Sequence, residues 1–417
     1  MPSIFGTIIA NAQQTQTLLK RVKNRKRFAV LSFEDDGVRC KRMYYDVDTR
    51  SAQEERGFFL KGITEKNLRN HKTMRAFLFA LYFPFPYKIS VLVPHHLGGS
   101  YYHTLTLQRA HADTPISQEE LDLFFSQQLG KSIEVNKKDI MRRTGCDDLD
   151  ALLVSNRVIS ILVDKQLVSI REFPQAPLGM TGREISFGVM QTFFHRPVFS
   201  ALQRLLPKRA KLHSFFQDGF TIPLSMVQYA LRGNSKKNSV KSFATALIRD
   251  TGTDIFACSG ESITYHDSIP IGYHSMYETL NAQLGIDFES FLQLLRSVSD
   301  HTASPHVVKQ VNAILSQEIR HMYNGLQSAK KETKSIGMII DPGKIGQYIG
   351  AHTPMKRVLI SRDAILFFDD IAIHALHDSL RMTAVMACIL RLPRKHFINE
   401  VATKHIRWLI PHSIEKM

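Results

Sequence analysis

The side chains of this sequence that could do nucleophilic or metal chemistry are scattered. The 4 cysteines are Cys40, Cys146, Cys258 and Cys388. They have no paired spacing, which argues against a disulfide framework and a zinc site and favours a reducing compartment. The histidines that invite a metal site, His95–His96, His301, His374 and His377, have no cysteine or glutamate at ligand spacing. No Gly-x-Ser-x-Gly elbow and no His-Glu-x-x-His helix occurs. We therefore predict no catalytic residue and no metal site.

A Gly-Lys pair stands in Asp341-Pro342-Gly343-Lys344. It lacks the Gly-x-x-x-x-Gly-Lys-Ser/Thr spacing with which a P-loop surrounds phosphates. The pattern predicts a turn at the end of a strand.

The composition is that of a globular protein with an anionic partner. The 417 residues suggest two or three domains, and 44% hydrophobic and 22% charged residues exclude a mainly disordered or collagen-like chain. Lys and Arg number 54 against 38 Asp and Glu, a formal net charge of +16. Such an excess favours nucleic acid, acidic lipid or an acidic protein as partner. No apolar run reaches the ~18 residues of a bilayer span, and no charged region precedes the first apolar stretch. We expect a cytoplasmic protein, soluble or peripheral at a membrane.

The N-terminal segment combines an apolar stripe with a basic run. Ile4, Ile8 and Ala12 recur at helical spacing, and Phe5 widens the stripe. The basic residues that follow are Lys20, Arg21, Lys23, Arg25, Lys26 and Arg27. This order is typical of an interfacial helix on anionic lipid. A helix packed on its own domain, followed by a solvated charge run, is the alternative.

Strand and helix patterns alternate along the rest of the chain. Strands are predicted over 28–33, 37–45, 88–93, 101–109, 151–162, 166–173, 183–192, 243–248, 254–257, 262–269 and 356–361. Helices are predicted over 114–130, 197–206, 222–231, 274–284, 288–299, 306–332 and most of 371–392. The polar, basic segment 232–242 is the best candidate domain boundary. Strands followed by helices, twice over, indicate an α/β or mixed α+β class.

Three segments resemble one family. Residues 247–272, LIRDTGTDIFACSGESITYHDSIPIG, resemble the second phosphate-binding hairpin of the actin-like ATPases and, among them, that of the cell-division protein FtsA. The helix and the segment Leu284–Glu289 that follow are similar to the FtsA pattern. The loop 176–185, APLGMTGREI, and the helix start 115–120, PISQEE, are similar to parts of FtsA's extra small subdomain. The pilus-assembly relative PilM shares the overall plan.

The resemblance implies a two-lobed, actin-like (ribonuclease H-like) α/β fold with an inserted small FtsA-type α+β subdomain. The implied domains follow one another along the chain. Residues 1–27 are an amphipathic and basic segment, 28–87 the first lobe, 88–192 the inserted subdomain and 193–232 the return to the first lobe. Residues 240–370 are the second lobe, and 371–417 are C-terminal helices that end in an amphipathic helix.

The resemblance also implies two hairpins that grip ATP, and both depart from the family pattern. The first should read Asp-x-Gly-Thr/Ser, but Ser32 stands at the metal-side Asp and Glu34 at a glycine. Two unit charges 4 Å apart repel by about 4 kcal/mol at an effective dielectric near 20, so an acidic turn opposes phosphate. Asp36 completes this turn.

The second hairpin should read Asp-x-Gly-Gly-Gly-Thr-Thr-Asp, and the chain offers Asp250, Gly252, Thr253 and Asp254. Either Asp250 is the surviving acidic residue or its position has become Leu247. Ser361-Arg362-Asp363 replaces the Gly-Gly of the adenosine side. We expect a degenerate nucleotide site that binds no cofactor. The alternative is a site that binds Mg-ATP through these four residues together with Ser32 and Asp36.

The C-terminal segment has an apolar helical stripe. Ile398, Val401, Ile406 and Leu409 share one face, with Trp408 at its edge. FtsA is similar in carrying a C-terminal membrane helix, but after a flexible linker that this chain lacks. Packing on the body, contact with a membrane through Ile406, Trp408 and Leu409, and binding in a partner's groove stay open.

The favoured hypothesis is a non-enzymatic, FtsA-like scaffold beneath an anionic membrane, which self-associates and recruits division or envelope-assembly proteins. A working ATPase of cell division or PilM-like pilus assembly is the first alternative. A basic nucleic-acid-binding protein is the second, and no aromatic-rich strand motif, helix-turn-helix or zinc finger supports it.

Overall fold

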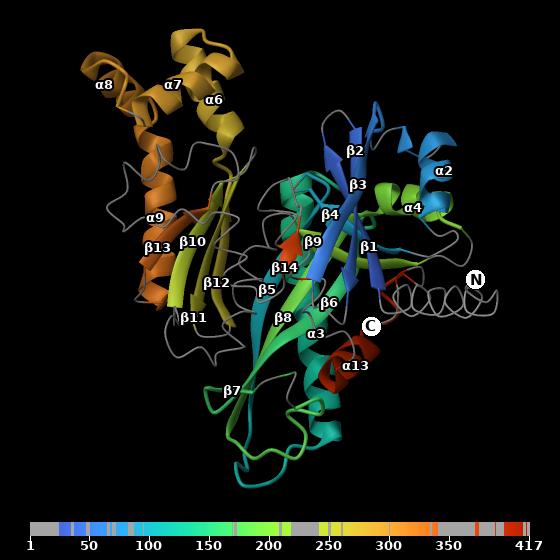
Figure 1. Cartoon of the computed structure of the whole chain (residues 1–417). Coiled ribbons are helices and arrows are strands. Elements are labelled where there is room, and N and C mark those ends of the chain that lie inside the picture. Colours follow the sequence, from blue (N-terminus) through green and yellow to red (C-terminus); the bar gives the residue numbers. More distant parts are fainter. Residues whose placement is uncertain are drawn as a thin grey trace, which may run out of the picture.

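The computed structural model covers the whole chain (Figure 1). It describes residues 25–34, 37–46, 51–64, 67–68, 72–81, 87–94, 96–168, 170, 173–207, 211–217, 242–248, 252–259, 262–299, 301–333, 336–340, 372–374, 388, 396–411 and 414. Among the helices in these ranges, none is both long and apolar enough to cross a bilayer.

The first sheet has six strands in the order β14-β3-β2-β1-β4-β9. Its antiparallel part is β1 (Arg25–Glu34), β2 (Gly37–Asp46) and β3 (Ser51–Lys61). The strands β4 (Lys88–Val93), β9 (Leu212–Gln217) and β14 (Ala372–His374) join in parallel. Helices α2 (Lys72–Ala80) and α4 (Arg196–Leu205) pack on one face of this sheet and share its core. The apolar run of β1 explains its central place, because a strand covered on both faces needs apolar side chains on both.

The second sheet repeats this strand order. Its strands β10 (Ser242–Ile248), β11 (Thr253–Ser259) and β12 (Ser262–Ile269) form an antiparallel meander, and β13 (Ile336–Ile340) pairs in parallel with β10. The order β12-β11-β10-β13 therefore matches β3-β2-β1-β4. Two sheets with this topology in one chain are the expected two-lobed actin-like α/β fold, and the predicted fold class is confirmed.

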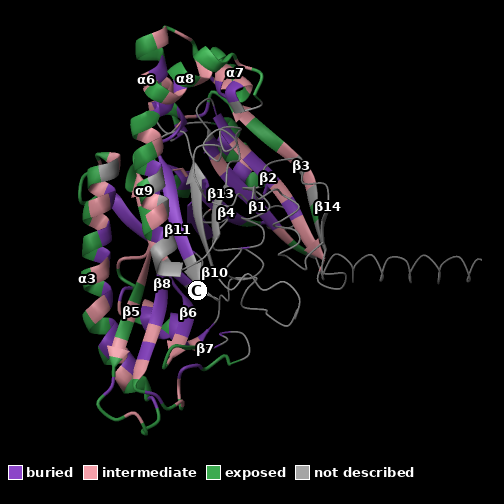
Figure 2. Ribbon diagram, turned by 90° about the vertical axis from the view of Figure 1, so that its left-hand side faces the viewer, coloured by how far each residue is buried: buried purple, intermediate pink, exposed green. Residues whose placement is uncertain are grey.

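A third sheet lies between β4 and β9 in the sequence. It has the order β5-β8-β6-β7 and consists of β5 (Gly98–Gln108), β6 (Ala151–Val163), β7 (Gln166–Val168) and β8 (Glu184–His195). Helix α3 (Gln118–Thr144) covers one face, and Figure 2 shows β6 and β8 largely buried beside it. The insertion begins at β5 and not at residue 88, because β4 hydrogen-bonds to β1 within the first sheet.

Four consecutive helices of the second lobe lie within the described residues: α6 (Tyr273–Leu284), α7 (Phe288–Ser299), α8 (Pro305–Ile314) and α9 (Ser316–Thr333). The single helix predicted over 306–332 is wrong, since the chain breaks at Leu315. The apolar stripe already changes phase there, because Ile314 and Ile319 are five residues apart. The break lets α8 pack on α6 while α9 runs along the second sheet (Figure 1).

Other predictions differ in detail. The strand over 166–173 ends at Val168, and helix 114–130 runs on to Thr144, where Gly145 ends it in a left-handed conformation with φ 69°. Residues 372–374, predicted as helix, form β14 instead, because they pair with β3. The strands β3, β9 and β13 were not predicted. The elements expected over 222–231 and 356–361 lie outside the described residues, and the domain boundaries otherwise stay predictions.

Candidate functional site

The first hairpin is closed by contacts within the sheet. Glu34 faces Gly37 across the turn, and Ser32 lies half-buried between Arg39 of β2 and Leu92 of β4. A Cβ atom on Gly37 would lie 2.5 Å from the carbonyl oxygen of Leu60 in β3. This glycine is therefore required by the approach of a neighbouring strand. Asp36 lies outside the described residues.

The second hairpin has a similar feature. Ile248 faces Thr253 across its turn. A Cβ atom on Gly252 would lie 2.9 Å from the carbonyl oxygen of Ile269, so this glycine too is explained by a close backbone approach. Asp250 lies outside the described residues.

Thr253 uses its hydroxyl inside the second lobe. It donates a hydrogen bond of 2.6 Å to the carbonyl oxygen of Ile271 and lies 3.7 Å from the sulfur of Met322 in α9. The side chain is directed to the helix-covered face of the sheet. It is thus engaged with protein and not presented at the turn.

Asp254 points to the opposite face, because side chains alternate along a strand. Its Oδ1 lies 3.9 Å from Nε2 of His266 in β12, and both side chains are buried. The His266 ring stacks on Phe256, with ring centroids 4.7 Å apart and 14° between the planes. This acidic residue therefore has an imidazole as neighbour within its own sheet.

The face that holds His266 also meets the inserted subdomain. His103 of β5 lies within electrostatic range of His266 and contacts Asn136 of α3. Burial lowers the pKa of His103, the Asn136 hydrogen bond raises it and His266 lowers it further. The charge of His266 thus acts on His103 where β5 and β12 of the second sheet meet. Among the described residues, no three His, Cys, Asp or Glu side chains are grouped as metal ligands.

The basic N-terminal run is divided by the structure. Ile4, Phe5, Ile8, Lys20, Arg21 and Lys23 lie outside the described residues. Arg25, Lys26 and Arg27 are not part of a separate N-terminal segment, because they form the first residues of β1 and pair with β2. The guanidinium of Arg27 lies 5.8 Å from the centre of the Tyr87 ring.

The C-terminal helix α13 (Phe397–Lys404) packs on the body, on the inserted sheet and α3. Asn399 accepts a hydrogen bond of 2.7 Å from the backbone N–H of Val158, and Asp122 binds both Lys404 and His405 at 3.0 Å. Ile406 is 3% exposed and Leu409 is half-buried against the same core, so Ile406 contacts protein and not a membrane. Trp408 is 79% exposed. Among the three C-terminal candidates, Trp408 alone presents a large apolar surface.

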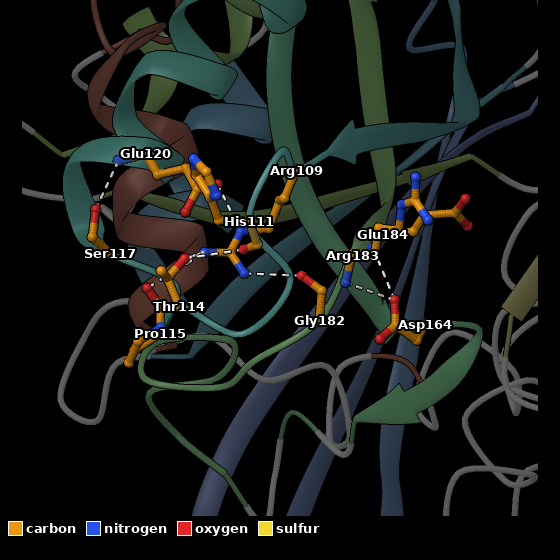
Figure 3. Close-up of polar contacts among 10 residues, drawn as sticks. All are labelled: Arg109, His111, Thr114, Pro115, Ser117, Glu120, Asp164, Gly182, Arg183 and Glu184. Atoms are coloured by element: carbon orange, nitrogen blue, oxygen red, sulfur yellow. Dashed lines mark hydrogen bonds and ion pairs between the residues drawn. The ribbon is translucent and has the colours of Figure 1, made fainter.

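The two segments that resemble the FtsA subdomain lie together in the structure (Figure 3). Two backbone hydrogen bonds join Ile116 to the loop 176–185. The N–H of Ile116 donates to the carbonyl of Met180 at 2.8 Å, and the N–H of Gly179 donates to the carbonyl of Ile116 at 3.0 Å. The buried Arg109 links the two segments, since its Nε is 2.7 Å from Glu120 and its Nη1 donates to the carbonyl of Gly182 at 2.9 Å. The loop also borders a surface groove of about 400 Å³.

Sequence reasoning did not single out Arg109 and Arg157, which the structure buries, or His266, whose side chain is 8% exposed. Arg157 had a signal, because it is the one charged residue in the strand ALLVSNRVISILV. A charge inside an apolar strand is costly to bury and calls for a partner. The other two stand in polar surroundings that give no such signal.

Comparison with known proteins finds likeness in structure alone. No protein-family model and no curated protein matches the sequence. Among solved structures, a PilM-PilN type IV pilus biogenesis complex matches with a TM-score of 0.46 and 8% identity, over 92% of this chain and 99% of that one. A Bacteroides thetaiotaomicron protein of actin-like ATPase fold and unknown function matches with a TM-score of 0.34 and 8% identity, over 88% of this chain and 98% of that one. The ethanolamine utilization protein EutJ of Carboxydothermus hydrogenoformans matches with a TM-score of 0.33 and 7% identity, over 87% of this chain and 89% of that one.

These structural similarities are low. The class of fold is therefore taken from the strand order that the first and second sheets share. The chain is an α/β protein of actin-like fold, with a small α+β unit inserted into its first lobe.

Proposed function

We propose that this chain is an actin-like scaffold protein of the FtsA type that does not use ATP. The observation that carries the proposal is the state of the two hairpins. Gly37 and Gly252 serve close packing of neighbouring strands, and the Thr253 hydroxyl binds the carbonyl of Ile271. An ATP site needs free backbone N–H groups and hydroxyls at these turns to bind the phosphates.

An actin-like protein that does not use ATP can still assemble with further copies of itself and recruit other proteins. In this proposal the protein lies in the cytoplasm at the inner face of the membrane, associates with further copies and recruits division or envelope-assembly proteins. The basic residues Lys20, Arg21 and Lys23 favour an anionic membrane surface, because each nearby cation adds about 1 kcal/mol of attraction to it. Trp408 suits the interfacial region for the same surface.

Titration calorimetry with Mg-ATP tests the first part of the proposal. We expect no heat of binding with the wild-type chain. Micromolar binding that Asp254→Asn abolishes would establish the alternative, an active ATPase of cell division or PilM-like pilus assembly.

Sedimentation with vesicles tests the second part. The full chain should bind vesicles that contain anionic lipid and not neutral ones. Replacement of Lys20, Arg21 and Lys23 by Gln should remove this binding, whereas Arg25–Arg27 must be kept because they belong to β1. A matched variant with Lys131, Lys138 and Lys309 changed to Gln, all exposed, removes the same charge and should still bind. Equal loss in both variants would contradict a local membrane contact.

A further inference from the structure

Three exposed lysines stand where the strands β1, β4 and β9 of the first sheet begin. Lys26 is the second residue of β1, Lys88 is the first residue of β4, and Lys211 directly precedes β9. Each side chain is exposed, whereas each strand continues into buried residues. Because β4 pairs in parallel with both β1 and β9, the three strand starts lie at one edge of the sheet.

The register places the three lysines on the same face of the sheet. Phe28 of β1 lies beside Lys88, and Lys26 is two residues before Phe28 and thus on the same side of its strand. The strands β4 and β9 pair from the next residue onward, which makes Lys88 and Lys211 neighbours as well. Neighbouring strands are about 4.8 Å apart, so the row from β1 to β9 is about 10 Å wide.

The acidic residues of the adjoining strands belong to the other face. Asp46 of β2 pairs in register with the residue before Lys26, so it lies on the opposite side of the sheet. Glu55 of β3 accepts a hydrogen bond from Tyr87, which is part of the core on that opposite side. Like charges on neighbouring strands repel. The row of lysines is therefore a cationic surface that suits an anionic partner.

The C-terminal segment meets the same edge of the sheet. Ile414 forms a β-bridge with Leu212, the residue after Lys211. Ile410 packs against the cores of the first lobe and of the inserted subdomain, and Trp408 stands two residues before it with 79% of its surface exposed. The chain from Trp408 to Ile414 spans at most about 20 Å, even if fully extended. An exposed indole thus lies near the exposed lysines.

We propose that this edge of the first sheet contacts the anionic membrane, with Lys26, Lys88 and Lys211 at the lipid headgroups and Trp408 in the interfacial region. The inference rests on the proposed membrane function and adds the part of the folded body that meets the lipid. Cations near an anionic leaflet and tryptophan at its interface are the side chains that such a contact uses.

The order of the chain favours lipid as the anionic partner. The apolar stripe of Ile4, Phe5 and Ile8 and the basic run after it lead directly into β1. A lipid surface offers hydrocarbon to such a stripe and negative charge to the run, whereas a nucleic acid offers the charge alone. A membrane that binds this segment is therefore held beside the strand starts.

The fluorescence of Trp408 tests the indole contact, because the chain contains 1 Trp. Vesicles of phosphatidylcholine and phosphatidylserine should shift the emission of the full chain to shorter wavelength, since the indole leaves water. Lipids with brominated acyl chains in these vesicles should quench the emission. Vesicles of phosphatidylcholine alone should have neither effect.

Sedimentation with the same vesicles tests the lysines. The double variant Lys88→Gln, Lys211→Gln should bind at least about tenfold more weakly, because each cation near the surface contributes about a fivefold factor in affinity. Both positions are exposed, so the urea midpoint should not change. The control Lys131→Gln, Lys138→Gln removes the same charge from exposed positions of α3 and should bind like the wild type.

The proposal requires both results, and failure of either one overturns it. If the full chain binds anionic vesicles through Lys20, Arg21 and Lys23 while the emission of Trp408 stays unchanged, the proposed membrane function stands and this contact is wrong. If the full chain does not sediment with anionic vesicles, the membrane function itself fails, and the contact with it. An emission shift with single-stranded DNA at about 0.15 M salt, and none with vesicles, would identify nucleic acid as the partner and overturn the membrane contact.

Discussion

The carboxylate of Asp254 lies 3.9 Å from the imidazole of His266 on the neighbouring strand, and both side chains are nearly inaccessible to solvent. In the family pattern, the corresponding acidic residue ends the second phosphate hairpin. Here its charge has a basic neighbour in its own sheet, and Phe256 holds the imidazole ring by stacking. The carboxylate of Asp254 therefore takes part in the packing of the second lobe.

The first prediction concerns the energetic coupling of this pair. A double-mutant cycle with Asp254→Asn and His266→Gln should give a coupling free energy of about 0.5–3 kcal/mol in urea unfolding, as neighbours in a buried network do. The exposed pair His274–Glu278 on α6 is the control. It should give about 0.5 kcal/mol or less. Equal coupling in both pairs would contradict a special role for Asp254.

The second prediction concerns Gly252. Gly252→Ala should lower the free energy of unfolding by about 1–3 kcal/mol, because the new methyl group would meet the carbonyl oxygen of Ile269. Gly130→Ala is the matched control, since Gly130 is an exposed residue of α3 with no atom within 4 Å of its Cβ position. This control should raise the free energy of unfolding by about 1 kcal/mol. If Gly252→Ala were neutral, the glycine would not be explained by packing.

The third prediction concerns pH. Burial lowers the pKa of His103, so the unfolded chain takes up this proton at a higher pH than the folded protein does. Between the two pKa values the unfolded state binds more protons, and the free energy of unfolding therefore rises with pH. The stability associated with neutral His103 is complete above about pH 6.5, the unfolded value, and falls as the pH drops toward the folded value.

Urea midpoints at several pH values below neutrality measure this effect. His103→Gln should flatten the decline in stability on acidification, whereas His274→Gln at an exposed helix position should not. Parallel pH profiles for wild type and His103→Gln would show that His103 is not the group responsible.

The fourth prediction concerns the attachment of α13. Asn399→Ala should cost about 1–3 kcal/mol, because the backbone N–H of Val158 would lose its buried acceptor. Trp408→Ala should change stability by about 0.5 kcal/mol or less, since the side chain is exposed. A loss of vesicle binding in Trp408→Ala would then report on membrane contact and not on folding. Unfolding in urea and hydrogen exchange at Val158 are the measurements.

Local patterns were sufficient for many elements. The alternating and apolar runs predicted β1, β2, β4, β5, β6, β8 and the meander of β10, β11 and β12. Capping residues predicted the start of α3, where Ser117 accepts a hydrogen bond from the N–H of Glu120. The strands β3 and β9 were missed, because SAQEERGFFLK is largely polar and LHSFFQ is short. Each is a strand because a neighbouring strand pairs with it.

The sequence by itself determined the class of fold. The order of strands and helices indicated an α/β or mixed α+β class, and the resemblance of three segments to one family implied two actin-like lobes with an insertion. It also showed that the phosphate motifs were altered, because glycine and acidic residues can be counted without a structure. Only the tertiary structure decided what the remaining residues contact. Thr253, Asp254 and Ile406 could each have faced a ligand or a membrane, and each lies against protein. The environment of Arg157 was likewise decided by β9 and Cys388, which are distant in sequence. Burial and hydrogen bonding depend on such long-range neighbours, and local sequence does not specify them.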